Sequence, residues 1–439
     1  MNQLLKIFCT AALIWITSTT LLKAQNDVIK CGPMVGYSAM REVALWVQLT
    51  READIKFAWK PAAVKDGPWL FSPAGKTQIG NAYIFQASAS MLEPGTEYNY
   101  SIWVDGKEVK MTYPLTFKTQ ALWNWRTDPP DFRFIAGSCF YVNEDPYDRP
   151  GRPYGGGYSI YKEMVKDKPD FMVWLGDNTY FREVDYDSRS GIYHRHSHSR
   201  SVSELQPLLG SISHYAIWDD HDYGPNDSHW TYPLKFHARD AFRDYWPSNT
   251  YGAGHTEGIT SWFYWNDCEF FMLDNRWYRT VETSGSILGE TQKWWLLESL
   301  KASKASFKFV CIGGQFISDA KVFENFANYE EERLEIIQYL DENDIKGVVF
   351  LTGDRHHSEI SKMKTEKGNI YYDITSSPVL SGAGNHEEEA NQFRMPKSMI
   401  GERNYAVIEV AGPRKSRTLQ VIFKNTEGKE ISRYNLNSE

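Results

Sequence analysis

The pattern of apolar and polar residues divides the chain into two parts. From residue 27 to about 122, strand-forming residues alternate or gather in short runs, as at 43–49, 55–59 and 98–104. Turn residues separate these runs, and Asp105-Gly106 between two of them predicts a hairpin. Several short strands in so little sequence predict a small all-β sandwich over residues 25–122.

A different pattern of apolar and polar residues begins after a linker at 123–130, which ends in Pro129 and Pro130. Short apolar strands now alternate with helical stretches, which predicts one α/β domain over residues 131–439. The pattern predicts helices over 158–166, 203–209, 235–245, 290–303 and 329–342. Strands are predicted at 132–136, 171–175, 215–218, 270–273, 307–312 and 348–351, with later ones near 370, 405 and 418.

Composition narrows the class of protein. The 439 residues are 42% hydrophobic and 24% charged, which fits a globular protein and excludes collagen, a disordered chain and a multi-span membrane protein. The net charge of −8 and the absence of a basic block argue against a dedicated nucleic-acid surface. A small phosphorylated substrate stays open, because it needs only local positive charge.

The first residues resemble an export signal. Lys6 precedes an uncharged stretch, 7–22, which is too short and too polar for a membrane span, and Ala24 follows. We expect a cleaved signal peptide at 1–24 rather than a buried amphipathic helix, and a periplasmic or extracellular protein. The leader has no paired arginines, so it fits general secretion. Lys30 before Cys31 disfavours a lipoprotein.

Chemistry-bearing residues follow the predicted strands of the second part. The segments concerned are Gly137-Ser-Cys139, Gly176-Asp177 with Tyr180, Asp219-Asp220-His221-Asp222, Asp274-Asn-Arg276, Gly313-Gly-Gln315 and Gly353-Asp354-Arg355-His356. Strand ends of open α/β sheets project side chains into one crevice. Each segment alone could be a turn, a buried cysteine or a structural histidine. Together they predict a multivalent metal site, because clustered carboxylates are unfavourable without cations.

In this order, the motifs resemble those of the PhoD-like alkaline phosphatases, a branch of the calcineurin-like metallophosphoesterases. The resemblance covers about residues 131–425, and residues 92–100 resemble a late strand of fibronectin type III modules. It implies an α/β fold in four layers, two mixed β-sheets flanked by helices, preceded by a small fibronectin- or immunoglobulin-like sandwich.

The resemblance also implies a site that binds Fe³⁺ with Ca²⁺. Asp177 would bridge the cations, Cys139 and Tyr180 would bind iron, and Asp220 would bind the divalent neighbour. The implied set is completed by Asp354, His356 and Asn226 (or Asp227 beside it), while Gln315 stands where relatives use a histidine. Thiolate and phenolate suit trivalent iron, and carboxylate and amide oxygens suit calcium. Iron-loaded relatives leave by the twin-arginine route, so other metals remain open here.

The function expected from these residues is hydrolysis of phosphomonoesters, phosphodiesters or both, by in-line attack of a metal-bound hydroxide. His221 is the candidate acid for the leaving group, and Arg276, Arg279 and Arg355 are candidates to hold phosphoryl oxygens. Small phosphate esters or phospholipids would be the substrates. A phospholipase D-like diesterase or a nuclease is the alternative enzyme. A non-catalytic phosphate- or glycan-binding surface protein is the alternative class, and a glycoside hydrolase fits less well.

A histidine-rich stretch stands outside these motifs. If residues 193–200 were extended, His194, His196 and His198 would share one face. That arrangement could be a zinc site, a positive rim that attracts phosphate, or a solvated loop. We expect His357 to be structural and the acidic run 386–389 to be a solvated loop.

Overall fold

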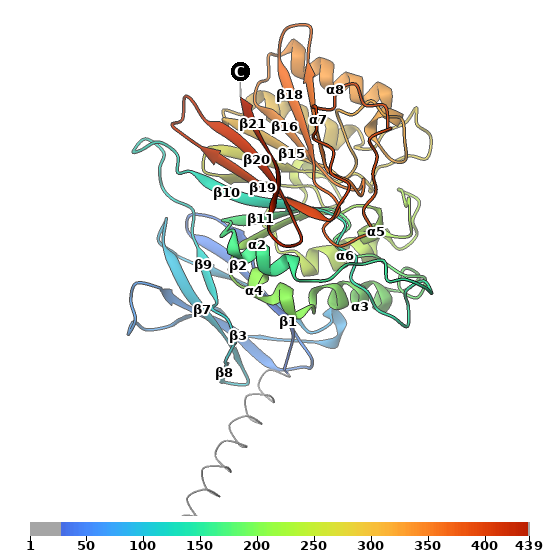
Figure 1. Cartoon of the computed structure of the whole chain (residues 1–439). Coiled ribbons are helices and arrows are strands. Elements are labelled where there is room, and N and C mark those ends of the chain that lie inside the picture. Colours follow the sequence, from blue (N-terminus) through green and yellow to red (C-terminus); the bar gives the residue numbers. More distant parts are fainter. Residues whose placement is uncertain (1–27, 438–439) are drawn as a thin grey trace, which may run out of the picture.

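The computed structural model describes residues 28–437, so the predicted leader and its cleavage point lie outside the described residues. Two large β-sheets pack face to face, and a smaller third sheet packs against the N-terminal strands of the first (Figure 1). Among the described helices the longest has 13 residues, and none is long and apolar enough to cross a membrane.

The first sheet has nine strands and is mixed. Its centre is parallel, with β10, β11, β12 and β1 side by side, and the outer strands run antiparallel. In spatial order the strands are β21 (Glu430–Asn437), β20 (Thr418–Asn425), β19 (Asn404–Ala411), β10 (Phe132–Gly137), β11 (Phe171–Leu175), β12 (Ser213–Ile217), β1 (Ile29–Ser38), β2 (Glu42–Leu49) and β6 (Ile84–Ser90).

The second sheet has six strands and is also mixed. Four of its strands, β14, β15, β16 and β18, are parallel, and an antiparallel strand closes each edge. The spatial order is β13 (Ser261–Trp265), β14 (Cys268–Met272), β15 (Phe307–Cys311), β16 (Val348–Thr352), β18 (Ile370–Thr375) and β17 (Glu359–Lys364).

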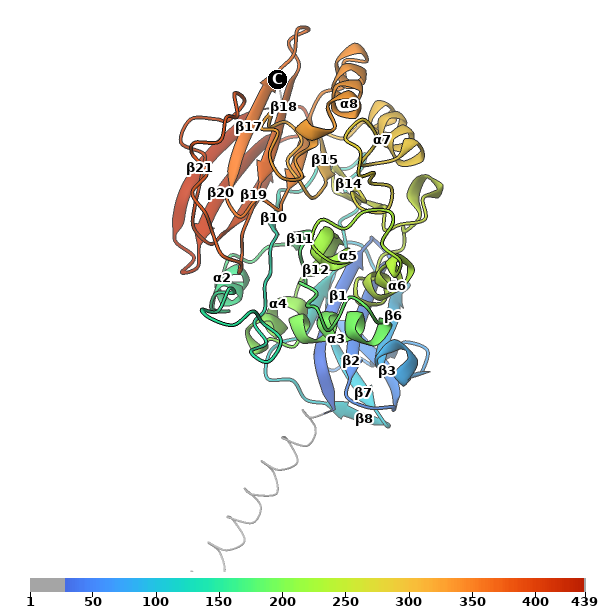
Figure 2. The same ribbon diagram turned by 90° about the vertical axis from the view of Figure 1, so that its right-hand side faces the viewer.

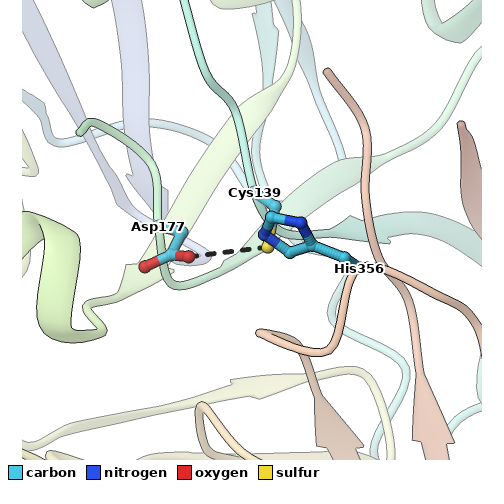
Figure 3. A group of neighbouring side chains, drawn as sticks. All are labelled: Cys139, Asp177 and His356. Carbon is cyan, nitrogen blue, oxygen red and sulfur yellow. Dashed lines mark hydrogen bonds between the residues drawn. The ribbon is translucent and has the colours of Figure 1, made fainter. Parts of the chain in front are cut away.

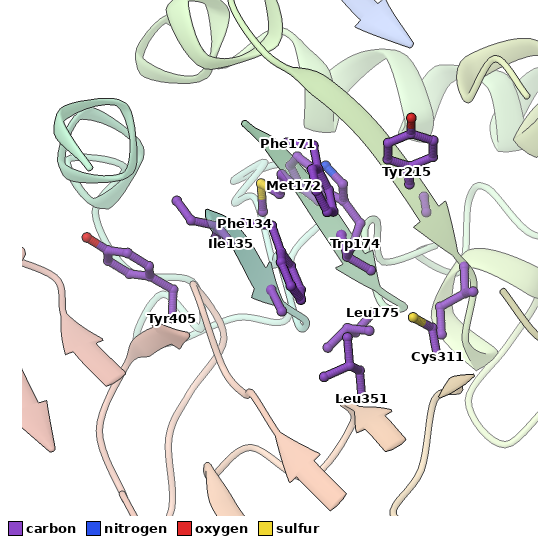
Figure 4. Packing of buried hydrophobic residues seen from close by; sticks show 14 of the residues in the cluster. Phe134, Ile135, Phe171, Met172, Trp174, Leu175, Tyr215, Cys311, Leu351 and Tyr405 are labelled. Atoms are coloured by element: carbon purple, nitrogen blue, oxygen red, sulfur yellow. The ribbon is translucent and has the colours of Figure 1, made fainter. Parts of the chain in front are cut away.

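Aromatic side chains fill the space between the two sheets. The ring of Phe134 on β10 stacks on Phe171 at a centroid distance of 4.9 Å and meets Phe270 of the facing sheet edge-on at 5.4 Å. Phe270 in turn stacks on Phe309 at 4.7 Å. Figure 4 shows part of this core, in which Leu175 and Leu351 come from opposite sheets. Burial of apolar area on this scale is the main force that holds the sheets together.

Helices cover the outer faces, which confirms the predicted four-layer α/β fold. Helices α7 and α8 pack on the six-stranded sheet, and α2, α3, α4 and α6 pack on the nine-stranded one (Figure 2). The helices are α2 (Ile160–Lys166), α3 (Arg189–Arg200), α4 (Gln206–Leu209), α5 (Asp220–Tyr223), α6 (Lys235–Tyr245), α7 (Glu290–Ala302) and α8 (Glu330–Glu342). Short 3₁₀ turns lie at Ile79–Asn81, Ser203–Leu205, Ala253–His255 and Phe326–Asn328.

The N-terminal strands form a sandwich that shares a sheet with the α/β part. Its second sheet consists of β3 (Asp54–Pro61), β4 (Leu70–Phe71), β5 (Gly75–Lys76), β7 (Glu97–Val104), β8 (Lys107–Val109) and β9 (Thr116–Lys118). Side chains on β2 alternate between two cores: Leu45 faces the sandwich, and Trp46 faces the α/β core. The nine-stranded sheet therefore runs across the boundary predicted at residues 123–130.

The hairpin predicted at Asp105-Gly106 is confirmed. Strands β7 and β8 pair antiparallel on either side of it. Asp105 and Gly106 both have positive φ, 48° and 76°, which is the conformation of a two-residue hairpin turn that matches the strand twist.

Candidate metal centre

The carboxyl ends of the parallel strands in both sheets meet at one place, and the predicted ligands gather there. The ligand atoms of Cys139, Asp177 and His356 lie within 4.8 Å of one another (Figure 3). Those of Asp177, Asp220 and His221 form a second group of the same kind. These residues follow β10, β11, β12 and β16, so four strand ends contribute. Asp177 belongs to both groups and therefore lies between them.

Unusual backbone conformations point these side chains into the site. Cys139, Asp177, Asp354 and His356 all have φ between 52° and 66°, the left-handed region that non-glycine residues rarely adopt. Local hydrogen bonds hold the turns, such as the amide of His356 donating to Ser377 Oγ at 2.9 Å. Such strain is typical of functional sites, because the surrounding fold must stabilise it.

The glycine before each aspartate lets the strand ends approach closely. A Cβ at Gly176 would lie 2.7 Å from the Cβ of Asp219, and φ there is +89°. At Gly353 a Cβ would lie 2.6 Å from the carbonyl oxygen of Leu175, in the opposite sheet. Each Gly-Asp pair thus combines a tight backbone contact, within the first sheet at Gly176 and between the two sheets at Gly353, with a ligand directly after it.

Direct contacts join the ligands of the first group. The hydroxyl of Tyr180 donates to Asp177 Oδ2 at 2.9 Å and lies 3.5 Å from Nε2 of His356. The thiol of Cys139 donates to Asp177 Oδ2 at 3.5 Å. A thiol, a phenol, a carboxyl group and an imidazole therefore converge in a buried space, which is a donor set suited to a transition metal.

Three buried carboxylate oxygens of the cluster have no hydrogen-bond partner within the described residues. They are Asp177 Oδ1, Asp219 Oδ2 and Asp220 Oδ1. Leaving a buried acceptor unsatisfied costs free energy, and native proteins rarely do so without a functional reason. Cations would satisfy these oxygens, so the residues fit the metal centre that the sequence predicts.

The charges of the cluster disturb its proton equilibria. Burial, together with the neighbouring anionic groups, raises the pKa of Asp177 well above its usual range. It also raises the pKa of Asp219 to about 6 and that of Asp354 to about 7. For Asp220 burial is outweighed by His221 and Arg276, which lower its pKa to about 2. An apo site therefore retains protons where cations would otherwise balance the charge.

The sequence predicts that Arg276 contacts the substrate, whereas in the structure its side chain is bound by neighbouring acids. Its side chain is fully buried and forms ion pairs with Asp219 and Glu324. Its five N–H groups are taken up by these two carboxylates and by the carbonyl of Ser228. Arg276 therefore fixes two acids beside the site and has no donor left for a phosphoryl oxygen.

The other predicted phosphate-holding arginines differ from Arg276. Arg279 is nearly buried and pairs with Glu324 at 2.8 Å. Arg355 uses one terminal nitrogen for Glu389, at 2.7 and 2.6 Å, while its buried Nε has no partner. Within the described residues, the guanidinium of Arg355 thus retains a donor that Glu389 does not use.

Other predicted residues lie at varying distances from the cluster. His221 is half-buried, and its ring centroid lies 4.2 Å from that of Tyr180. Asn226 is exposed and donates to Asp227 at 2.8 Å, and the Asp227 amide donates to Asp220. In the described chain the Asp354 carboxylate belongs to neither ligand group. Gln315 is buried in a network with Glu359.

The histidine-rich stretch is helical, so its three histidines do not share one face as they would in an extended strand. In α3, His194 and His198 are one turn apart and both approach Glu144, at 3.2 and 3.7 Å. His196 points to the other side and stacks on Tyr245 with centroids 5.1 Å apart. Within residues 28–437 none of the three belongs to a metal-ligand group.

Sequence reasoning missed three residues of the site. Asn275 donates to Asp219 at 2.7 Å, and as a strand-end residue it follows the rule that found its neighbours. Glu324 lies in a group with Asp219 and Asp220, but it belongs to a loop far from any strand end, and no pattern marks it. Tyr154 lies 2.9 Å from Nδ1 of His356, in a loop whose only signal is its glycines.

The fold is that of a known class of phosphatases. A solved structure of PhoD superposes with a TM-score of 0.75, at 18% identity over 94% of this chain and 89% of that one. The purple acid phosphatase PPD1 from yellow lupin (Lupinus luteus) seeds gives 0.68, at 12% identity over 93% and 75%. These likenesses establish the fold.

The particular family follows from the sequence comparison. The model of the PhoD-like phosphatase family matches residues 134–412, and the chain belongs to that family. Alkaline phosphatase D of Bacillus subtilis (strain 168) is 22% identical in an alignment 382 residues long, and the match covers 72% of this chain. The chain spans 64% of the length of that relative.

Proposed function

We propose that the protein is an exported, metal-dependent phosphoric ester hydrolase. The observation that carries the proposal is the pair of ligand groups that share Asp177, with three carboxylate oxygens left without hydrogen-bond partners. Membership in the PhoD-like phosphatase family supports the same reaction class.

The donor set divides into two halves of different chemistry. Cys139, Tyr180 and His356 lie on one side of Asp177, and soft or strongly donating atoms of this kind fit ferric iron. Asp220 and the carboxylates around it offer oxygens, which fit calcium, and His221 adds a ring nitrogen to this half. Asp177, which both ligand groups share, would hold the cations together with Asp354 and Asn226 as further ligands.

The chain's own residues would bind, orient and protonate the substrate. When bound, the cations supply a water of lowered pKa and neutralise phosphoryl charge. Arg355, whose buried Nε has no hydrogen-bond partner within the described residues, would donate to a non-bridging oxygen. His221, whose ligand nitrogen lies within 4.8 Å of Asp177 and Asp220 oxygens, would pass a proton to the leaving oxygen. Arg276 would hold Asp219 in place.

The test compares Asp177→Asn and Asp220→Asn with wild type on p-nitrophenyl phosphate and bis(p-nitrophenyl) phosphate. We expect both variants to lose at least about a hundredfold in kcat/KM, because each removes a charged ligand. Exposed Asp66→Asn is the matched control and should keep full activity. The ratio of the two substrates assigns monoester or diester preference, and full activity of both site variants would refute the proposal.

Export rests on the sequence of residues 1–24 alone. Expression of the full chain in a bacterium with a periplasm should give a mature protein whose first residue is Gln25. Mass spectrometry of the fractionated cells measures this, and an intact Met1 in the cytoplasm would contradict it.

A further inference from the structure

A cavity of about 750 Å³ lies beside the metal centre. Its walls include Arg152, Tyr154, Gly382, Glu402 and Arg403. The ring of Tyr154 lines this cavity, while its hydroxyl lies 2.9 Å from Nδ1 of the predicted ligand His356. Tyr154 therefore links the cavity to a predicted ligand of the metal centre.

The backbone around the cavity holds one arginine in place. Nε of Arg403 donates to the carbonyls of Leu380 and Ser381, at 2.8 and 2.9 Å, and a terminal nitrogen donates to that of Tyr154 at 3.1 Å. A Cβ at Gly156 would lie 2.8 Å from Arg403 Nε, so the glycine lets the guanidinium lie against the loop. The remaining N–H groups of Arg403 stay available on a head that is already oriented.

Neither arginine of the cavity is paired with a carboxylate in the described part of the chain. Arg152 is exposed and forms no hydrogen bond or ion pair within the described residues, and Arg403 forms no ion pair there. By contrast, the arginines nearer the ligands are each paired with a carboxylate; these are Arg182, Arg195, Arg276, Arg279 and Arg355. Glu402 is the only acid among the nine lining residues, so the cavity has a net positive charge.

We propose that this cavity is a subsite for the alcohol part of the substrate, and that Arg152 and Arg403 select alcohols with a second anionic group. The proposal rests on the proposed function, because it needs the scissile phosphate at the metal centre. A guanidinium without a carboxylate partner binds carboxylate or phosphate by charge-assisted hydrogen bonds. A neutral alcohol would leave both arginines unpaired. The substrate class is therefore a phosphate ester that carries a further carboxylate or phosphate.

A matched series of substrates tests the charge requirement. Propyl phosphate, 3-(phosphonooxy)propanoate and propane-1,3-diol bisphosphate share the scissile ester and differ in the distal group, which is neutral, a carboxylate or a phosphate. We expect the wild type to favour the two anionic substrates. Arg152→Gln and Arg403→Gln should each lower kcat/KM for those two about fivefold to tenfold and leave propyl phosphate unchanged. The difference between the two anionic substrates identifies the preferred group.

Controls separate this subsite from the reaction itself. Exposed Arg126→Gln, on the linker, should match wild type on all three substrates. Equal loss on every substrate, or none for Arg152→Gln, would overturn the subsite. Calorimetric binding of propane-1,3-diol bisphosphate to wild type and Arg152→Gln provides a readout without turnover. If no substrate is hydrolysed, the proposed function fails, while weaker binding by Arg152→Gln still supports the subsite and equal binding refutes it.

Discussion

The hydroxyl of Tyr154 lies 2.9 Å from Nδ1 of His356, on the side of the imidazole opposite the ligand cluster. Nε2 of the same ring lies 3.5 Å from the Tyr180 hydroxyl, inside the cluster. A hydrogen bond at Nδ1 fixes the orientation of the ring, and with the proton on Nδ1 the lone pair of Nε2 is free for a metal. Tyr154 is therefore a positioning residue for His356.

Tyr154→Phe should weaken metal binding about tenfold and leave the fold unchanged, because it removes only the hydroxyl that orients the ligand. Titration of the apo protein with metal, followed by elemental analysis, measures this effect. Tyr141→Phe is the control, because that hydroxyl bonds to Asp148 at 3.0 Å and not to a ligand. Equal metal affinity of wild type and Tyr154→Phe would contradict the role.

Removal of metal should lower the melting temperature of the wild type, because the oxygens of Asp177, Asp219 and Asp220 that have no hydrogen-bond partner in the described chain lose their cations. Without bound metal, Asp177→Asn should be more stable than the wild type. Removing one carboxyl group from the cluster reduces repulsion, so the apo variant should melt above the apo wild type and gain little from added metal. Thermal denaturation with chelator and after metal replenishment measures both. Identical melting curves with and without chelator would exclude a bound cation.

Arg276 should contribute strongly to stability. It is fully buried between Asp219 and Glu324, so Arg276→Leu leaves Asp219 without its cation and Glu324 with Arg279 alone. Breaking such a buried pair costs about 3–5 kcal/mol in the free energy of unfolding. Arg279→Leu removes the second arginine from the same Glu324 at a less buried place, and should cost about 1 kcal/mol. Urea denaturation compares the two, and equal losses would contradict the assignment.

Acid should destabilise the protein through His214. Its Nδ1 accepts from Trp174 at 3.0 Å, Nε2 lies 3.1 Å from the Leu208 carbonyl, and burial lowers its pKa to about 3. Between that value and about 6.5 the unfolded chain binds a proton that the folded chain does not, so stability falls as pH falls. From pH 7.5 to 5 this residue should account for about 2 kcal/mol.

His214→Gln provides the comparison, because glutamine does not titrate. Chelator-treated wild type and variant are unfolded with urea at several pH values. The variant should lose less stability on acidification than the wild type does. Parallel losses in the two proteins would show that His214 does not titrate as its burial predicts.

Much of the fold was predictable because its signals are local. Helix α6 spans the predicted residues 235–245, and the other predicted helices differ by a few residues at their ends. The sequence of α3 predicts a helix only weakly, because many of the residues on its buried face are polar, such as histidine and serine, instead of apolar. The continuation of the N-terminal strands into the large sheet could not be read locally, because it depends on the parallel pairing of β1 with the distant β12.

The sequence by itself determined that Cys139, Asp177, Tyr180, Asp220 and His356 belong at strand ends, because short apolar runs stop directly before them. Tertiary structure decided which of these side chains meet and what surrounds them. It placed Glu324 and Tyr154 beside the cluster and buried Arg276 between Asp219 and Glu324. The reason is physical: strand ends are set by neighbours in the chain, whereas charge pairing in a buried site is set by residues that only the folded sheets bring together.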